Sequence, residues 1–211
     1  MCPKGPRARP LMKLPVLLSP LAMAVALLTA ACSTTRSGYS SAPYTVVQGA
    51  GDFEVRDYPA LLVAQTLMKG SEDDGGFGRL FRFISGRNEQ ARKIAMTTPV
   101  LMSDEEGGRT MAFVMPATLP AGGVPQPTET AVSVREIPQG RFAVLRFSGG
   151  RSAEREQAAL GRLKAWMAER GLEAEASPVF GYFDPPWTPG FLRRNEVMLR
   201  LRDRGAGASA G

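Results

Sequence analysis

Two apolar segments decide the fold of this chain: Lys93-Ile-Ala-Met-Thr-Thr-Pro-Val-Leu-Met102 and Thr110-Met-Ala-Phe-Val-Met-Pro116. A glycine-containing acidic turn separates them, so the sequence predicts two strands joined by a loop. Alternation puts every second residue on one face: Ile94, Met96, Thr98, Val100 and Met102 in the first strand, and Met111, Phe113 and Met115 in the second. If Met102 lies opposite Met111, this face is soft, apolar and rich in thioethers, and it can pack a core or hold a large flat ligand.

An arrangement of strand, proline-containing turn and strand occurs twice in the sequence. Val55-Arg-Asp-Tyr-Pro59 precedes the apolar run 61–67, and Val134-Arg-Glu-Ile-Pro138, 79 residues further on, precedes the run 142–147. A glycine-containing turn and a helical pattern follow each pair. A match of five residues can arise by chance, but the shared order of elements favours a duplication.

Two amphipathic helices are predicted, over about 73–85 and 152–170. Their apolar stripes are Phe77, Leu80, Phe81 and Ile84 in the first, and Ala159, Leu160, Leu163, Trp166 and Met167 in the second. Ser152 is suited to the N-cap of the second helix, and Gly171 to its C-terminal end. Together with later strands, this order predicts an α+β fold. We expect a distorted, mainly antiparallel β-barrel or sheet, built from two similar β-α-β-type halves with two packed helices.

The N-terminal segment has the layout of a bacterial secretory signal. Four basic residues precede an apolar run over 14–31, and no acidic residue occurs before Cys32. Leu28-Thr-Ala-Ala-Cys32 resembles a lipobox, although Thr29 stands where Leu, Val or Ile is usual. The segment predicts lipidation of Cys32, with plain export after ordinary signal-peptidase cleavage as the alternative. Two prolines interrupt the run, which disfavours a permanent membrane span.

The chain is therefore expected to have four regions. These are a signal peptide over 1–31, a lipidated Cys with a flexible tether over 32–43, one folded domain over 44–202, and a disordered tail over 203–211. Ser33 rather than Asp follows the Cys, which in a Gram-negative cell favours an outer-membrane anchor. The expected location is the cell envelope, with the domain facing the periplasm.

The composition excludes several kinds of site. The formal charge of +6 falls to +2 once the four basic residues of the signal are removed, which leaves no basic stripe for nucleic acid. The chain has no histidine, and its two cysteines, Cys2 and Cys32, lie outside the expected domain. Ser-His-Asp and Cys-His catalysis, metal sites built on His or Cys, and axial ligation of haem by His are therefore excluded. We expect a protein that is not an enzyme.

Four segments resemble the SOUL haem-binding protein family. They are 55–59, 93–100, 111–116 and Phe180-Gly-Tyr-Phe-Asp-Pro-Pro-Trp-Thr-Pro-Gly-Phe-Leu-Arg-Arg-Asn-Glu-Val-Met198. The resemblance spans about residues 44–201, and it implies a distorted β-barrel of two halves that binds haem or a related tetrapyrrole on an apolar surface. Some members have been proposed to use an axial His, so this chain would have to resemble those that bind porphyrin by apolar contact. A related small-molecule-binding fold occurs in bacterial multidrug-sensing regulators, so the fold alone does not define the ligand.

The residues expected to contact the tetrapyrrole are Phe77, Arg79, Leu80, Phe81, Ile84, Met96, Phe113, Met115, Trp187 and Phe191. For the helical stripe and the methionines the competing interpretation is simple core packing. Arg79 or Arg82 could face the propionates, and Met could ligate iron weakly. Trp187 and Phe191, in or beside the proline-rich loop 184–190, could stack on the ligand or pin the loop.

The predicted function is that of a haem carrier, buffer or scavenger. Two alternatives follow from the same residues. One is an enzyme that modifies or degrades haem, which would need a reductant partner and a defined iron site. The other is a binding module for another amphipathic small molecule.

Overall fold

The computed structural model describes residues 35–36, 38–68, 75–118 and 123–202 of the 211-residue chain. The chain divides into Met1–Thr34 and a compact unit, Thr35–Gly211, and only the second unit is described below. The expected signal peptide, Cys32 and the tail lie outside the described residues, so the structure does not test the predictions made for them. No helix within the described ranges is long and apolar enough to cross a membrane.

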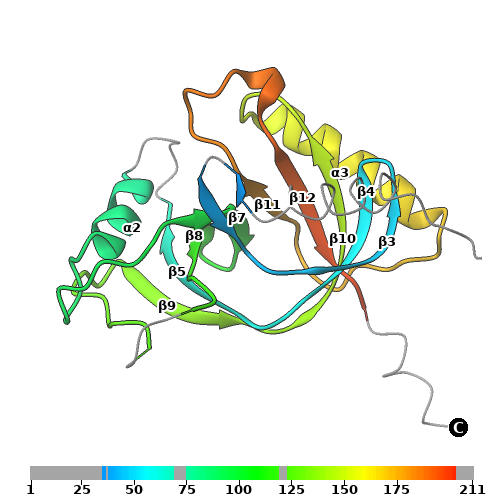
Figure 1. Ribbon diagram of the computed structural model, residues 1–211. Helices are drawn as coiled ribbons and strands as arrows, with labels where there is room; N and C mark the ends of the chain where they lie inside the picture. Colours follow the sequence, from blue (N-terminus) through cyan, green and yellow to red (C-terminus); the bar gives the residue numbers. More distant parts are fainter. Residues whose placement is uncertain (1–34, 37, 69–74, 119–122, 203–211) are drawn as a thin grey trace, which may run out of the picture. The chain divides into compact units, whose positions relative to one another are not determined.

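A curled sheet of nine strands forms most of the unit (Figure 1). Its strands are β3 (Thr45–Ala50), β4 (Phe53–Tyr58), β5 (Leu61–Leu67), β7 (Val100–Glu105), β8 (Gly108–Val114), β9 (Val132–Ile137), β10 (Gly140–Phe147), β11 (Val179–Tyr182) and β12 (Asn195–Arg200). They lie in the order β3-β4-β10-β12-β11-β7-β8-β5-β9, and every neighbouring pair is antiparallel. This confirms the predicted α+β fold with a mainly antiparallel, barrel-like sheet.

The strand order supports the predicted duplication. The first half contains β4, β5, α2 (Gly76–Ile84), β7 and β8, and the second contains β9, β10, α3 (Ala153–Ala168), β11 and β12. By their order in the two halves, β4 corresponds to β9, β5 to β10, β7 to β11 and β8 to β12. Exchanging every strand for its counterpart gives the same sheet order, read from the opposite edge. The two strands on either side of each proline turn do not pair with each other. Instead β4 pairs with β10, and β5 pairs with β9.

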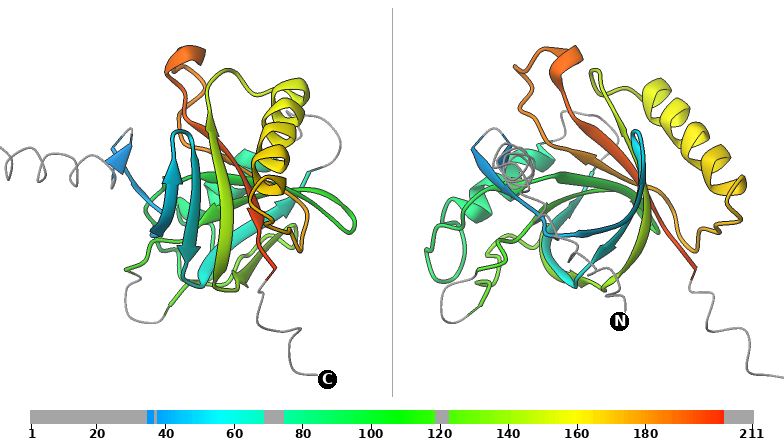
Figure 2. Two further views of the ribbon diagram at one scale, coloured as in Figure 1. Left: turned by 90° about the vertical axis from the view of Figure 1, so that its right-hand side faces the viewer. Right: turned by 45° about the vertical axis from the view of Figure 1, so that its right-hand side comes forward.

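Both helices cover one face of the sheet, on the outside of its curl (Figure 2). The five residues of the predicted α3 stripe are all buried there, against strands that include β10, β11 and β12. Ser152 caps α3 by accepting a hydrogen bond from the backbone N–H of Arg155, and Gly171 ends the turn after it with a φ of 59°. The opposite face carries a third cluster, formed by Ala42, Val63, Leu101, Ala112, Val114, Phe142, Val144 and Met198.

The methionine-rich hairpin is mostly core. Met102 lies opposite Met111 in the β7–β8 pair, as the sequence predicts, and both are buried under α2 with Phe113 and Met115. The first strand is shorter than expected, because residues 93–96 have no regular structure.

A small second sheet lies within and beyond the segment expected to be a tether. Its strands are β1 (Thr35–Arg36), β2 (Tyr39–Ser41) and β6 (Thr97–Thr98), and β2 runs parallel to β6. Ser41 Oγ lies 3.0 Å from Thr98 Oγ1, and Ala42 is buried next to this contact. The small polar residues of this segment gave no periodic signal, because the pairing depends on a distant partner.

Candidate functional site

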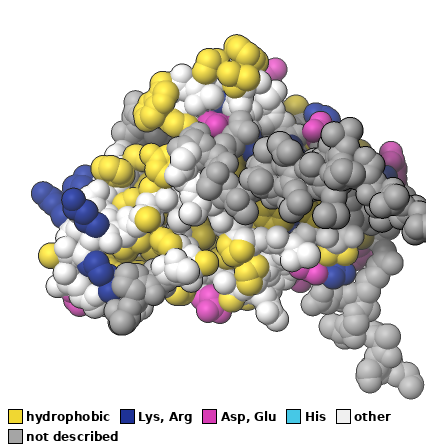
Figure 3. Space-filling view, in the orientation of Figure 1, with side chains coloured by type: hydrophobic (Ala, Val, Ile, Leu, Met, Phe, Trp, Pro, Cys, Tyr) yellow, Lys and Arg dark blue, Asp and Glu magenta, His cyan; other side chains and the backbone are white. Residues whose placement is uncertain are grey.

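An open groove of about 460 Å³ lies beside α2. We call it the α2 groove, and its lining residues are Tyr39, Phe77, Phe81, Met96, Thr98, Val100, Tyr182, Phe183, Asp184, Pro185, Pro186 and Trp187. One wall comes from α2, another from the small sheet and β7, and the rim from the loop between β11 and β12. Figure 3 shows hydrophobic side chains in yellow grouped on this face of the molecule. The volume falls in the range of roughly 300–1,000 Å³ that is usual for sites of small ligands.

The predicted stripe of α2 is divided between core and groove. Leu80 and Ile84 are buried in the core below the helix, whereas Phe77 and Phe81 are 48% and 49% exposed and line the groove. The rings of Phe77 and Phe81 stack at a centroid distance of 6.0 Å and an interplanar angle of 13°. Phe113 supports this pair from the core, with its ring 5.1 Å from that of Phe77. The structure thus presents a fixed pair of half-exposed aromatic rings.

The two arginines of α2 are held by partners outside the groove lining. Arg79 donates to Thr66 Oγ1 at 3.0 Å and to the carbonyl of Leu67 at 2.8 Å. Arg82 forms a two-point ion pair with Glu129, at 2.9 and 3.1 Å. Neither arginine lines the groove. Their proposed role toward a ligand carboxylate stays a prediction, and it would require these bonds to be broken.

Met96 is the one methionine of the predicted set that lines the groove. It is partly buried in the irregular segment before β6, whereas Met115 is buried in the core. A shallower hollow of about 370 Å³ shares Met96 and Phe81 with the groove and includes Ile84 and Lys93. Lys93 is exposed, and it has no hydrogen bond or ion pair with the described residues. The hollow therefore offers an unpaired cation next to the apolar groove.

The loop between β11 and β12 forms the rim. Trp187 lines the groove and is 81% exposed, whereas Phe191 is 79% exposed and lies outside the lining. Phe191 belongs to η1, a short 3-10 helix over Gly190–Leu192. The structure therefore brings four of the ten predicted residues together in the groove, namely Phe77, Phe81, Met96 and Trp187.

Several lining residues were not predicted as contacts. Tyr39 lies in the expected tether, and Val100 was identified only as a face residue of the hairpin. Tyr182 also lines the groove, but its hydroxyl donates to the buried Glu156, which also accepts from Arg109. Burial, and then this hydrogen bond, raise the pKa of Tyr182 above its ordinary value. The phenol is therefore held in its neutral form, which is a poor ligand for iron.

A second hollow lies on the inner face of the sheet, but it holds only about 50 Å³. Its lining is almost wholly apolar and includes Tyr58, Phe142 and Met198. This volume suits one or a few waters and not a tetrapyrrole.

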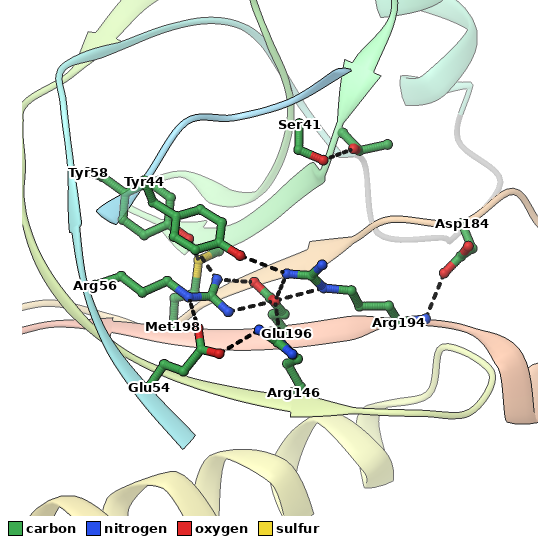
Figure 4. A network of polar contacts seen from close by, with 11 residues as sticks. Ser41, Tyr44, Glu54, Arg56, Tyr58, Arg146, Asp184, Arg194, Glu196 and Met198 are labelled. Atoms are coloured by element: carbon green, nitrogen blue, oxygen red, sulfur yellow. Dashed lines mark hydrogen bonds and ion pairs between the residues drawn. The ribbon is translucent and has the colours of Figure 1, made fainter. Parts of the chain in front are cut away.

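Beside this small cavity lies a buried network of charged side chains (Figure 4). Arg56 donates to both carboxylate oxygens of Glu196, at 2.8 and 3.0 Å, and to Glu54 at 2.6 Å. Arg194 also donates to Glu196, and Tyr44 lies over the guanidinium of Arg56 with its ring centre 4.1 Å away. Burial alone would raise the pKa of Glu196, but the hydrogen bonds and charges of Arg56 and Arg194 outweigh it and hold the pKa below its ordinary value. The network is internally paired and leaves no free charge for a ligand.

The described residues contain no group of three or more His, Cys, Asp and Glu side chains that could hold a metal ion. An apolar groove lined by a pair of aromatic rings is typical of the class of small-molecule-binding proteins. The model of the SOUL heme-binding protein family matches residues 39–200, and the chain belongs to this family. Curated relatives agree. The chain is 29% identical over 162 residues to Heme-binding protein 2 of Homo sapiens, covering 71% of this chain and 78% of that protein.

Mouse Heme-binding protein 2 (Mus musculus) is 26% identical, over 75% of this chain and 82% of that protein. Solved structures show a similar fold at much lower identity. The C-terminal domain of EcmrR has a TM-score of 0.54 and 12% identity, covering 75% of this chain and 98% of that one. A Listeria innocua protein described as a hydrolase has a TM-score of 0.52 and 10% identity, over 72% and 92% of the two chains. These likenesses show the fold alone.

Proposed function

We propose that the α2 groove binds haem and that the protein is a non-catalytic haem carrier, buffer or scavenger. One observation carries the proposal: a chain of the SOUL family has an apolar groove of suitable volume with two half-exposed aromatic rings in it. An aromatic surface of this kind suits the flat face of a porphyrin. The names of the curated relatives also point to haem.

Apolar contact supplies most of the affinity in this proposal. Phe77 and Phe81 contact the macrocycle from α2, and Trp187 contacts it from the rim. The chain has no histidine, and Tyr182 is held as a neutral phenol, so neither a histidine nor Tyr182 supplies a strong axial ligand. Met96 is the thioether in the groove, and it would be a weak ligand at most.

In this proposal the ammonium group of Lys93 binds the propionate carboxylates of the haem. Lys93 is exposed in the hollow that shares Phe81 and Met96 with the groove, and it is unpaired among the described residues. Arg79 and Arg82, by contrast, already have partners that do not line the groove. A propionate next to Lys93 would gain an ion pair without breaking an existing one.

Titration of the 33–211 chain with hemin and with metal-free protoporphyrin tests the proposal, because this chain contains the whole compact unit. Similar saturable affinity for both ligands, with a weakly perturbed Soret band for hemin, is the expected result. No saturable binding of either ligand overturns the proposal. Saturable binding of hydrophobic dyes that haem does not displace would favour another amphipathic ligand. Loss of the Soret band with a reductant and oxygen, yielding a linear tetrapyrrole, would favour a haem-degrading enzyme.

We further propose that the protein is anchored in the cell envelope by a lipid on Cys32, facing the periplasm and preferably at the outer membrane. The signal-like segment over 1–31 and the lipobox-like Leu28–Cys32 support this location. Mass spectrometry of the mature N-terminus tests it, with and without globomycin. An N-terminal Cys32 that carries lipid is expected, and an unmodified Cys32 overturns the anchor while leaving haem binding untouched.

A further inference from the structure

The loop between β11 and β12 carries the most exposed large apolar side chains among the described residues. Trp187 is 81% exposed, Phe191 79% and Leu192 55%. In Figure 3 hydrophobic side chains stand out over this loop, at the top of the view. Large aromatic side chains exposed to this degree cost free energy in water, and a group of them marks an interaction surface. We call Trp187, Phe191 and Leu192 the apolar tip.

Haem in the α2 groove does not account for the whole tip. Trp187 lines the groove, but Phe191 and Leu192 do not. A ligand in the groove would therefore cover one of the three side chains and leave the other two in water. Phe191 and Leu192 therefore suit a binding partner other than the ligand of the groove.

The tip is held in a fixed shape by its own loop. Arg193 Nε donates to the carbonyl of Thr188 at 2.7 Å, and a second guanidinium nitrogen donates to the carbonyl of Pro186. The backbone N–H of Gly149 donates to the carbonyl of Gly190 at 2.9 Å, which ties the loop to the turn after β10. These bonds and three prolines keep the aromatic side chains outside the core without a large loss of entropy on binding.

We propose that the apolar tip inserts into the interface of a lipid bilayer and holds the mouth of the α2 groove at the membrane surface. Trp is favoured at the boundary between lipid headgroups and acyl chains, and Phe and Leu are favoured below it. Loop residues 183–194 contain two arginines and one acid, Asp184, whose carboxylate accepts from the backbone N–H of Arg194 and is thereby held within the loop. Arg194 is paired with the buried Glu196, so the positive charge beside the tip is that of Arg193, which among the described residues bonds only backbone carbonyls and would lie among the headgroups of an anionic bilayer.

The inference also rests on the proposed envelope location. Tyr39, on the wall of the α2 groove, is seven residues after Cys32 in the sequence. A chain of this length spans at most about 25 Å. A lipid on Cys32 would therefore keep Tyr39 within about 25 Å of the bilayer, and the tip would supply a second, weaker contact.

The two tryptophans make the test specific. Trp166 is buried on α3 and stacked on Phe53, with ring centres 5.2 Å apart, whereas Trp187 is exposed in the tip. The 33–211 chain is mixed with vesicles of equal parts phosphatidylcholine and phosphatidylglycerol whose acyl chains are brominated. We expect quenching of Trp187 and co-sedimentation of the protein, both without haem. Phe191→Ser with Leu192→Ser should lower the vesicle partition coefficient at least about tenfold, because most of the inserted apolar area is lost.

A matched control keeps the test specific to the tip. Val46 and Val47 on the edge strand β3 are 47% and 49% exposed, and Val46→Thr with Val47→Thr should leave vesicle binding unchanged. Vesicle binding that the tip variant retains, or no binding of the wild-type chain, overturns the inference and leaves the tip to a protein partner. The same chains are titrated with hemin. Normal haem binding without vesicle binding refutes only this inference, and the reverse result refutes only the proposed function.

Discussion

The guanidinium of Arg56 and the carboxylate of Glu196 form a two-point ion pair in which both side chains are 0% exposed. Arg56 is on β4 and Glu196 is on β12, and β10 lies between these strands in the sheet. The pair therefore joins the first half of the chain to the second across a neighbouring strand. Neither residue of the pair lines the α2 groove.

Breaking this pair is expected to destabilise the fold strongly. Glu196→Gln removes the fully buried carboxylate that pairs with Arg56 and Arg194 and, among the described residues, leaves Arg56 paired with Glu54 alone, so it should lower the free energy of unfolding by about 3–5 kcal/mol. Arg56→Met combined with Glu196→Leu removes both charges and should cost less than the sum of the single changes. Urea unfolding of the wild-type chain, Arg56→Met, Glu196→Leu and their combination measures the cycle, and Glu196→Gln is measured beside them. The exposed pair of Arg141 and Asp57 is the control, and Arg141→Ala should cost less than about 1 kcal/mol.

Stability should fall in acid because of Glu196. Its folded pKa lies below that of an unfolded Glu, which is about 4.3. A carboxylate with a lowered folded pKa contributes its full stabilisation above the unfolded pKa and loses it as the pH falls through the folded value. The contribution of Glu196 to the urea midpoint is therefore expected to be nearly constant around neutral pH. The midpoint should fall as the pH drops below about 4. The double variant Arg56→Met, Glu196→Leu should drop less steeply, and an identical slope would contradict this assignment.

Neighbouring residues of α2 should separate binding from stability. Phe81→Ala removes a half-exposed ring from the groove and should weaken hemin binding by about 5- to 30-fold with little change in the unfolding midpoint. Leu80→Ala, one residue earlier, opens a cavity in the core and should cost about 2–5 kcal/mol of stability. Hemin titration and urea unfolding of both variants check the contrast. Unchanged hemin affinity in Phe81→Ala would place the ligand outside the groove.

Lys93 should recognise the carboxylates of the ligand. Lys93→Ala is expected to weaken hemin binding about threefold and to reduce its salt dependence, since a partly exposed ion pair contributes little. Hemin dimethyl ester, which has no free propionate, should bind both chains equally. Lys164→Ala, on the exposed side of α3, is the control for loss of a surface charge. An equal loss in both lysine variants would rule out a specific contact.

Met96 tests how the iron is held. Leu keeps the apolar bulk and removes the sulfur, so Met96→Leu should change hemin affinity by less than about threefold and leave the Soret band in place. Metal-free protoporphyrin is the control, because it has no iron for sulfur to bind. A shift of the ferrous spectrum in Met96→Leu, without a change in protoporphyrin affinity, would instead make Met96 an iron ligand.

Patterns along the chain predicted the elements well. The α3 stripe is buried in full, and Met102 lies opposite Met111, because local periodicity and alternation are direct consequences of helix and strand geometry. The same patterns did not reveal that β4 pairs with β10, since pairing between distant strands leaves no local signal. The short strand β2 was missed for the same reason.

The site was predicted less completely than the fold. An apolar stripe identifies the side of a helix that avoids water, but Leu80 in the core and Phe81 in the groove have the same pattern in the sequence. Arg79 seemed suited to a propionate by its position on α2, yet its partners are Thr66 and Leu67 on the neighbouring strand. Only three-dimensional packing separates these roles.

The pairing of β4 with β10 and of β5 with β9 has a consequence for the origin of the fold. Within each half three strands pair with one another, as β5-β8-β7 and β10-β12-β11, whereas the first strand of each half crosses to the other. This is the arrangement of a domain-swapped dimer contained in one chain. A single half would lose the pairing of its first strand with the other half, and two copies related by a twofold axis would restore this pairing. We therefore infer an ancestor that functioned as a homodimer before its gene was doubled and joined.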